Sequence, residues 1–345
     1  MVVSAEYVAD EPRSSAPLHW PLTSRLYLPE GGWAANPERR KRAHVPEEVE
    51  FRSKPQIALS LVEEARRWGV PFEVVVADCG YGDNPNFLRG LEEREISYVC
   101  GVESELGVRY PEEVVSAKEA GAPPYKGKGQ PPKEQRPAPL YMAREVIESV
   151  PEQAWREVSW REGSKGTLSK RVAAVRVHRG TGSERHSVEH ERVETGAEGW
   201  LIGERPLPGH AGGECKYYFS TLSQGSSLKR LTELAHSRWA IERFYEDSKG
   251  ECGLGDFQGR RWDGFHRHLA LSMVAYSFLM LESSVAYGGG TSREKEVFSP
   301  LGGDQADDAS GDPPAGSGVA AGGSGFMVHR DRPDKELPSS SNLTK

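Results

Sequence analysis

The sequence predicts an α/β protein in which helices pack on a mixed sheet, and three observations lead to this fold class. Short runs of Val, Tyr, Leu and Trp between turn-rich stretches are typical of strands. One segment carries apolar residues at the spacing of an amphipathic helix, and one short apolar run is typical of a central strand covered on both faces. In chain order we expect strands at 2–9 and 18–28, a helix at 54–68, a strand at 72–78, a helix at 84–94 and a strand at 97–102.

The middle of the chain differs in composition from these first elements. Pro- and Gly-rich stretches at 30–46 and 111–139 predict loops, and the first of them contains the basic run 39–42. Beyond the second loop we expect strands at 170–178, 200–204 and 216–221. We interpret this region as a β-rich insertion within the α/β domain.

The last part of the chain predicts two helices and then a tail. The helices are expected at 226–250 and 262–284. The residues beyond them are rich in Gly, Ser and Asp and have too few apolar side chains to build a core, so we expect disorder. The predicted divisions are a partial core at 1–102, the insertion at 103–225, the C-terminal core helices at 226–284 and a disordered tail at 285–345.

Composition excludes some classes of protein. The longest apolar run, Leu269–Leu281, falls short of the ~20 residues that span a bilayer, and we expect a buried helix and no membrane. The four cysteines form no Cys-x-x-Cys pair, which indicates a reducing cytoplasm rather than a disulfide framework or zinc site. The net charge of −7 argues weakly against nucleic acid, yet residues 156–179 hold seven Lys or Arg against two Glu. That stretch is either a phosphate-binding patch or a solvated strand surface.

Asp78 is the first candidate for chemistry. It ends the apolar run 72–78 and is followed directly by Cys-Gly-Tyr-Gly. The carboxyl ends of strands in open α/β sheets are where active sites form, and glycines there let the backbone turn sharply. The alternative is an aspartate that only caps the next helix.

A second group of candidates lies on the helix expected at 226–250. Arg238, Glu242 and Lys249 are spaced by four and seven residues. At ~100° per residue they share one narrow stripe of the helix. A carboxylate between two cations can bind a metal and hold phosphate oxygens nearby. The alternative is an i,i+4 ion pair on a solvated helix.

The stretch Arg238-Trp-Ala-Ile-Glu242-Arg-Phe-Tyr-Glu-Asp-Ser-Lys249 resembles the C-terminal signature of bacterial insertion-sequence transposases of the DDE superfamily. That signature is Tyr-x2-Arg-x3-Glu-x6-Lys, and Ala235 stands in this chain at the Tyr position. Ala77-Asp78-Cys-Gly-Tyr-Gly is similar to the segment that carries the family's second Asp, and Trp160-Arg-Glu-Gly-Ser-Lys-Gly to part of its β-rich insertion. The likeness extends from about residue 17 to residue 284.

The resemblance implies an RNase H-like fold and DNA cleavage and strand transfer by two-metal phosphoryl transfer. Asp78 and Glu242 would be the second and third carboxylates, holding two Mg²⁺ or Mn²⁺ ions. The DNA contacts implied are Arg238 and Lys249 on phosphates and Trp160, Arg161 and Lys165 in the insertion. The partner would be double-stranded DNA at transposon ends, bound by a homodimer.

The family's first Asp has no clear counterpart in this chain, and Asp10 and Glu6 are weak substitutes. We therefore expect a copy truncated at the N-terminus, lacking a central strand and inactive alone. Such a loss would leave apolar strand edges. The alternatives are an active enzyme in which another acid completes the site, a non-catalytic DNA-binding remnant that interferes with intact transposase, and an unrelated metal-dependent hydrolase.

Overall fold

A computed structural model describes residues 1–9, 18–120, 127, 138–163, 166–181, 195–209, 213–289 and 323–329. Within these residues eleven strands form one mixed sheet, in the order β2-β1-β11-β3-β4-β10-β9-β8-β5-β6, with β7 paired to β8. Its strands are β1 (Val2–Ala9), β2 (Leu18–Leu26), β3 (Val74–Ala77), β4 (Ser97–Val102), β5 (Gly107–Arg109), β6 (Tyr141–Met142), β7 (Arg156–Gly163), β8 (Gly166–Arg179), β9 (Glu198–Arg205), β10 (Lys216–Ser220) and β11 (Gly323–His329). The expected α/β class and mixed sheet are confirmed.

Helices cover both faces of the sheet. They are α1 (Pro37–Ala43), α2 (Lys54–Arg67), α3 (Cys79–Gly82), α4 (Pro85–Glu92), α5 (Pro111–Ala120), α6 (Ala143–Glu148), α7 (Leu228–Ser237), α8 (Trp239–Gly250) and α9 (Trp262–Gly289), with a π-helix at Glu30–Ala34 and a 3₁₀ turn at Glu152–Ala154. Local chemistry fixes where several begin. Ser53 and Gln56 form a reciprocal capping box at the start of α2, and the Asn84 side chain accepts a hydrogen bond from the Phe87 N–H at the start of α4.

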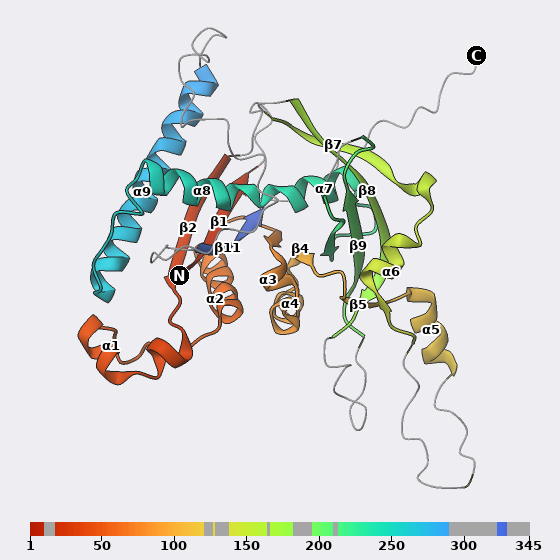
Figure 1. Ribbon diagram of the computed structural model, residues 1–345, viewed down its shortest axis with the longest axis horizontal. Coiled ribbons are helices and arrows are strands. Elements are labelled where there is room, and N and C mark those ends of the chain that lie inside the picture. Colours follow the sequence, from red (N-terminus) through yellow and green to blue (C-terminus); the bar gives the residue numbers. More distant parts are fainter. Residues whose placement is uncertain are drawn as a thin grey trace.

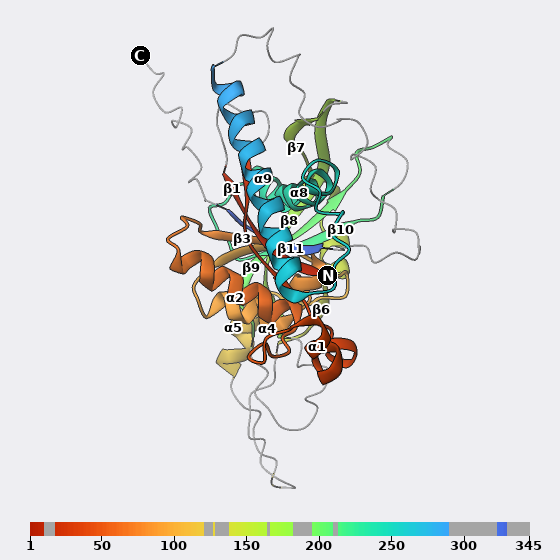
Figure 2. The same cartoon turned by 90° about the vertical axis from the view of Figure 1, so that its left-hand side faces the viewer.

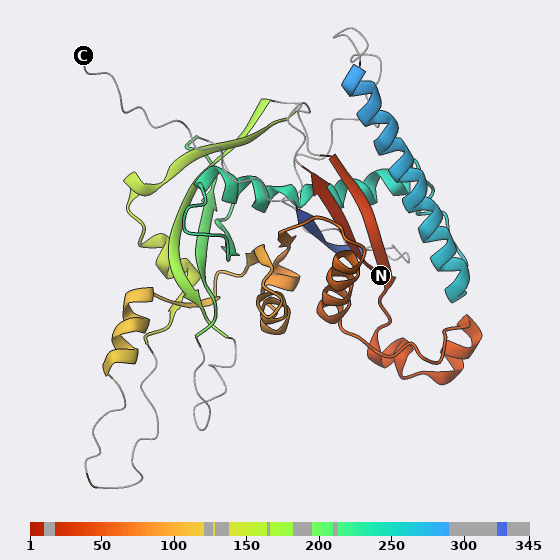
Figure 3. The ribbon, with the colours of Figure 1, turned by 180° about the vertical axis from the view of Figure 1, so that it is seen from behind.

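The alternation of side chains along the strands divides the core into two layers. In β3, Val75 and Ala77 point to the face covered by α2 and α4, while Val74 and Val76 point to the face covered by α7, α8 and α9. Figures 1 and 3 show these helices from the two sides of the sheet. A sheet buried on both faces explains why 74–77 is a continuous apolar run.

The tail contributes a central strand, contrary to the expectation of disorder throughout 285–345. β11 lies between β1, to which it is parallel, and β3, to which it is antiparallel. Phe326, Met327 and Val328 are fully buried there. The strand edges of β1 and β3 are therefore paired, and the open apolar edges that we expected are absent from the described residues. The rest of 290–345 lies outside the described residues.

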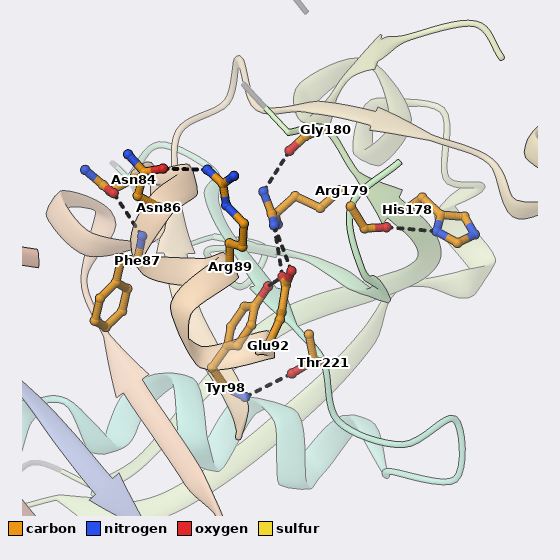
Figure 4. Close-up of polar contacts among 11 residues, drawn as sticks. Asn84, Asn86, Phe87, Arg89, Glu92, Tyr98, His178, Arg179, Gly180 and Thr221 are labelled. Carbon is orange, nitrogen blue, oxygen red and sulfur yellow. Dashed lines mark hydrogen bonds and ion pairs between the residues drawn. The ribbon is translucent and has the colours of Figure 1, made fainter. Parts of the chain in front are cut away.

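The region expected as an insertion continues the same sheet. β10 pairs antiparallel with β4, and β9 and β8 follow in order. Figure 4 shows a side-chain cluster across this junction: Glu92 of α4 accepts hydrogen bonds from Tyr98 of β4 at 2.7 Å and from the buried Arg179 of β8 at 2.9 Å. A buried guanidinium is stable only when it is paired, so loss of the Glu92 carboxylate would leave the Arg179 charge uncompensated beside the β4–β10 junction.

Three local expectations are wrong. Residues 30–46 contain the π-helix and α1 rather than a loop, because Asn36 caps α1 and Pro37 fits its first turn. Residues 111–120 form α5, although much of the remaining expected loop lies outside the described residues. The single helix expected at 226–250 is divided into α7 and α8, which join at Arg238.

Candidate functional site

Asp78 lies at the junction between β3 and α3. Its backbone is extended, with φ −82° and ψ 179°, and its side chain makes no capping hydrogen bond to α3. Gly82 lets α3 lie close against β4, because a Cβ there would meet the Gly101 carbonyl oxygen at 1.9 Å. Asp78 therefore does not act as the side-chain cap of α3, and its carboxylate can interact with groups from other elements.

The groups that it faces come from the start of α8. Arg238 Nη1 lies 3.8 Å from Asp78 Oδ2, and Arg238 also forms an ion pair with Glu242 one helical turn further on. The guanidinium thus bridges two carboxylates that are 242 − 78 = 164 positions apart in the sequence. The arrangement unites the two sequence candidates in one cluster, which we call the Asp78–Arg238–Glu242 site.

This site is open to solvent. The side chains of Asp78 and Arg238 are each 36% exposed and that of Glu242 is 56% exposed. Exposed ion pairs contribute about 0–1 kcal/mol to stability, so these pairs do little to stabilise the fold. Two carboxylates and a cation facing solvent at the carboxyl end of a strand suit the binding of a phosphate ester and a metal ion.

Lys249 lies at the other end of α8 from Arg238. Eleven residues of helix place the two about 16 Å apart along the axis. Lys249 is exposed, with its Nζ 6.0 Å from the centre of the Tyr245 ring. Of the three residues predicted to share a stripe, only Arg238 and Glu242 lie at the site with Asp78. Ala235, at the family's Tyr position, is buried on α7 and contributes only packing.

The predicted DNA-contact residues of β7 lie beside the site, against side chains that we did not single out from the sequence. Trp160 stacks on His236, with ring centres 3.8 Å apart and planes 10° apart. His236 in turn contacts the buried carboxylate of Glu204. His236 lies two residues before Arg238 in the sequence and Trp239 directly after it, so a search for aromatic residues next to Arg238 would have found both. The Arg161 guanidinium lies 4.3 Å from the centre of the Trp239 ring.

Three of the seven basic residues at 156–179 are already paired with carboxylates within the protein. Arg171 pairs with Glu152, Arg176 with Glu198 and Arg179 with Glu92. A phosphate would have to compete with these carboxylates, so this stretch is a weaker anion site than its charge count indicates. Lys165 lies outside the described residues.

The Asp78–Arg238–Glu242 site offers a divalent ion two carboxylate ligands. Among the described residues no group of three or more His, Cys, Asp and Glu side chains could hold a metal ion. Mg²⁺, however, is commonly held by one or two carboxylates together with water and substrate phosphates. Asp78 and Glu242 supply such a pair once Arg238 moves to the phosphate, which suits one ion better than two.

Of the two acids considered as substitutes for the missing carboxylate, Glu6 does not join this site. Asp10 lies outside the described residues. Glu6 is fully buried in β1, where His19 Nδ1 lies 3.5 Å from Glu6 Oε2. Burial raises the pKa of Glu6 well above its ordinary value of 4.5, and burial lowers the pKa of His19 to about 4. His19 is therefore neutral near pH 7, and burial favours the protonated form of Glu6.

Replacing Glu6 by Gln is expected to stabilise the protein at alkaline pH. The carboxyl binds its proton more tightly when folded, so the stability that it contributes is present below pH 4.5 and is lost as the pH rises through its raised pKa. Gln does not titrate, so its melting temperature should exceed that of the wild type by roughly 3 °C or more at pH 8 and should match it near pH 4.5. His19 opposes this trend, losing stability as the pH falls from 6.5 to about 4, but it does so in both proteins. The exposed Glu48→Gln variant is the control, and an equal pH profile for Glu6→Gln and wild type would contradict the prediction.

Comparison with protein families finds a match for part of this chain. A family model described as DDE superfamily endonuclease matches residues 12–167, a range that includes Asp78, Trp160 and Arg161 but not Arg238 or Glu242. The match supports a DDE-type transposase or endonuclease, a class that acts on DNA and generally uses divalent metal ions. A search of curated proteins found no match. None of the described helices is long and apolar enough to cross a membrane.

Proposed function

We propose, in place of the inactive truncated copy expected from the sequence, that this chain is a DDE-type transposase that binds transposon-end DNA and catalyses phosphoryl transfer at the Asp78–Arg238–Glu242 site. The observation that carries the proposal is the bridge that Arg238 makes between the two carboxylates. One of them lies in the segment that matches the endonuclease family and the other beyond it. The same residues in the same order form the transposase-like signature Arg238-x3-Glu242-x6-Lys249.

Each residue has a distinct task in this proposal. Asp78 and Glu242 would hold a divalent ion, which when bound would supply Lewis acidity at the scissile phosphate. Arg238 neutralises the two acids when DNA is absent and turns to a non-bridging phosphate oxygen when DNA binds. Trp160 and Arg161 lie beside the site and would contact the DNA strand, with base stacking worth about 1–3 kcal/mol. A homodimer would hold the two transposon ends.

A second candidate function is DNA binding without cleavage, by a protein that competes with an active transposase. It is favoured by the small number of acids at the site, since two carboxylates in the described residues suit one ion rather than two. It requires DNA binding that weakens steeply with salt and no cleavage with any metal.

The test is nicking of supercoiled DNA with Mg²⁺ or Mn²⁺ by the wild type and by Glu242→Ala. Glu246→Ala is the matched control, because Glu246 lies four residues further along the same helix and is exposed. We expect metal-dependent nicking that Glu242→Ala lowers by about 100-fold and Glu246→Ala leaves unchanged. Folded wild-type protein that binds DNA but never nicks it would overturn the catalytic proposal in favour of the second function.

A further inference from the structure

Helix α9 is apolar around its whole circumference, although the described part of the protein covers only one side of it. Its inner side packs on β2 and α8 through the buried Leu269, Ser272 and Tyr276. A helix that is apolar all round is ordinarily buried on all sides. Figure 2 looks toward α9 and shows it at the periphery of the described elements, with none of them over its outer side.

The outer side carries a regular row of exposed apolar residues. Leu271 is 69% exposed, Val274 67%, Phe278 59% and Leu281 53%. Their spacing of three, four and three residues keeps them in one line along the helix, as at the seam of two paired helices. We call this row the α9 stripe. Contiguous apolar patches of this kind mark interaction sites on soluble proteins.

Charges at the two ends of the α9 stripe indicate what covers it. Arg267 is exposed near its N-terminal end, where it lies 4.0 Å from the Asp263 carboxylate, and Glu282 is exposed near its C-terminal end. The fourteen residues between Arg267 and Glu282 include no Asp, Glu, Lys or Arg. In an antiparallel pair of identical helices each Arg267 meets a Glu282, whereas a parallel pair would bring like charges together.

We propose that the α9 stripe is a homodimer interface in which two copies of this chain pair their α9 helices antiparallel. Matching Arg267 with Glu282 fixes the register, because it sets Leu271 of each copy opposite Phe278 of the other and Val274 opposite Ala275. Apolar side chains then meet at the centre of the row, and Leu281 of each copy faces His268 of the other. The dimer forms without DNA, so its existence does not depend on the proposed catalytic function.

The chain's own residues 290–322 are a poor alternative cover for the α9 stripe. They contain only four large apolar residues, which are Val297, Phe298, Leu301 and Val319, among many Gly, Ser and Asp. Such a composition buries too little apolar area to hold a segment on a helix. A second copy supplies the same row of apolar residues with complementary ends.

Sedimentation analysis of the full chain without DNA tests the interface. We expect a dimer of about twice the 38.0 kDa chain mass at micromolar concentration. Phe278→Glu should raise the dissociation constant by about 30-fold or more while leaving the circular dichroism spectrum unchanged, since Phe278 is exposed in the single chain. Val115→Glu on α5, also an exposed apolar position, should leave the dimer intact.

A charge exchange tests the antiparallel register. Arg267→Glu and Glu282→Arg should each weaken the dimer, and the two together should restore it. A monomeric wild type at high concentration would overturn the proposal and point to residues 290–322 as the cover. A dimer that survives Phe278→Glu would overturn it by placing the interface elsewhere. Both outcomes are independent of DNA cleavage, so they leave the proposed function untouched.

Discussion

Replacing Phe326 by Asp is expected to lower the free energy of unfolding by more than about 5 kcal/mol, enough to unfold many domains at 25 °C. Phe326 is fully buried in β11, where it pairs with Ala5 of β1 and Ala77 of β3. Removal of a buried Phe side chain alone costs about 3–5 kcal/mol, and a buried carboxylate adds its desolvation. The measurement is urea denaturation followed by circular dichroism.

The physical reason is the place of β11 in the sheet. Its backbone pairs with β1 over seven register positions and with β3 over four. Loss of the strand would leave two unpaired edges in the middle of the sheet, with their N–H and C=O groups exposed. A chain from which residues 290–345 have been removed should therefore aggregate or melt well below the wild type.

β11 also positions the candidate site. A Cβ at Gly325 would lie 3.1 Å from the side chain of Ile241, which immediately precedes Glu242 in α8. Gly325 therefore lets α8 approach the sheet closely. Val115→Asp, at an exposed position of α5, is the control for Phe326→Asp. If Phe326→Asp and the shortened chain both melted like the wild type, β11 would not be part of the stable sheet.

Replacing Asp78 by Asn is expected to weaken Mn²⁺ binding by about 100-fold and to lower metal-dependent DNA nicking by at least as much. Asn has nearly the same shape but no charge, so it removes one of the two carboxylates that would hold the ion. It also leaves Arg238 paired only with Glu242, which should leave DNA affinity little changed or slightly higher. Mn²⁺ binding is measured by electron paramagnetic resonance, independently of cleavage.

Asp83→Asn is the matched control for this substitution. Asp83 is an exposed aspartate five positions further along, and it accepts a hydrogen bond from the Glu103 N–H that the Asn oxygen can still accept. It should leave Mn²⁺ affinity and nicking unchanged. Equal Mn²⁺ affinity in the wild type and Asp78→Asn would show that Asp78 is not a metal ligand.

The elements predicted best are those whose sequence signals are local. The strand at 97–102 and the helix from Lys54 begin where their patterns begin, because side-chain periodicity and capping act over a few residues. β11 was missed because its apolar run, Phe326-Met-Val, is only three residues long and follows Gly-Ser-Gly in a Gly-rich tail. It becomes a strand by pairing with β1 and β3, which lie hundreds of residues away in the chain. The division of one expected helix into α7 and α8 at Arg238 likewise has no signal in the apolar spacing.

The sequence by itself determined the α/β class, the strand that ends at Asp78 and the helical stripe of Arg238 and Glu242, because each depends on residues close together in the chain. Only the tertiary structure decided that Arg238 lies between the two carboxylates and that Lys249 does not join them. It also decided that Arg171, Arg176 and Arg179 are neutralised, since each ion pair joins segments that the sequence keeps apart. Charges interact through space, so their partners are fixed by the packing of the sheet and helices rather than by spacing along the chain.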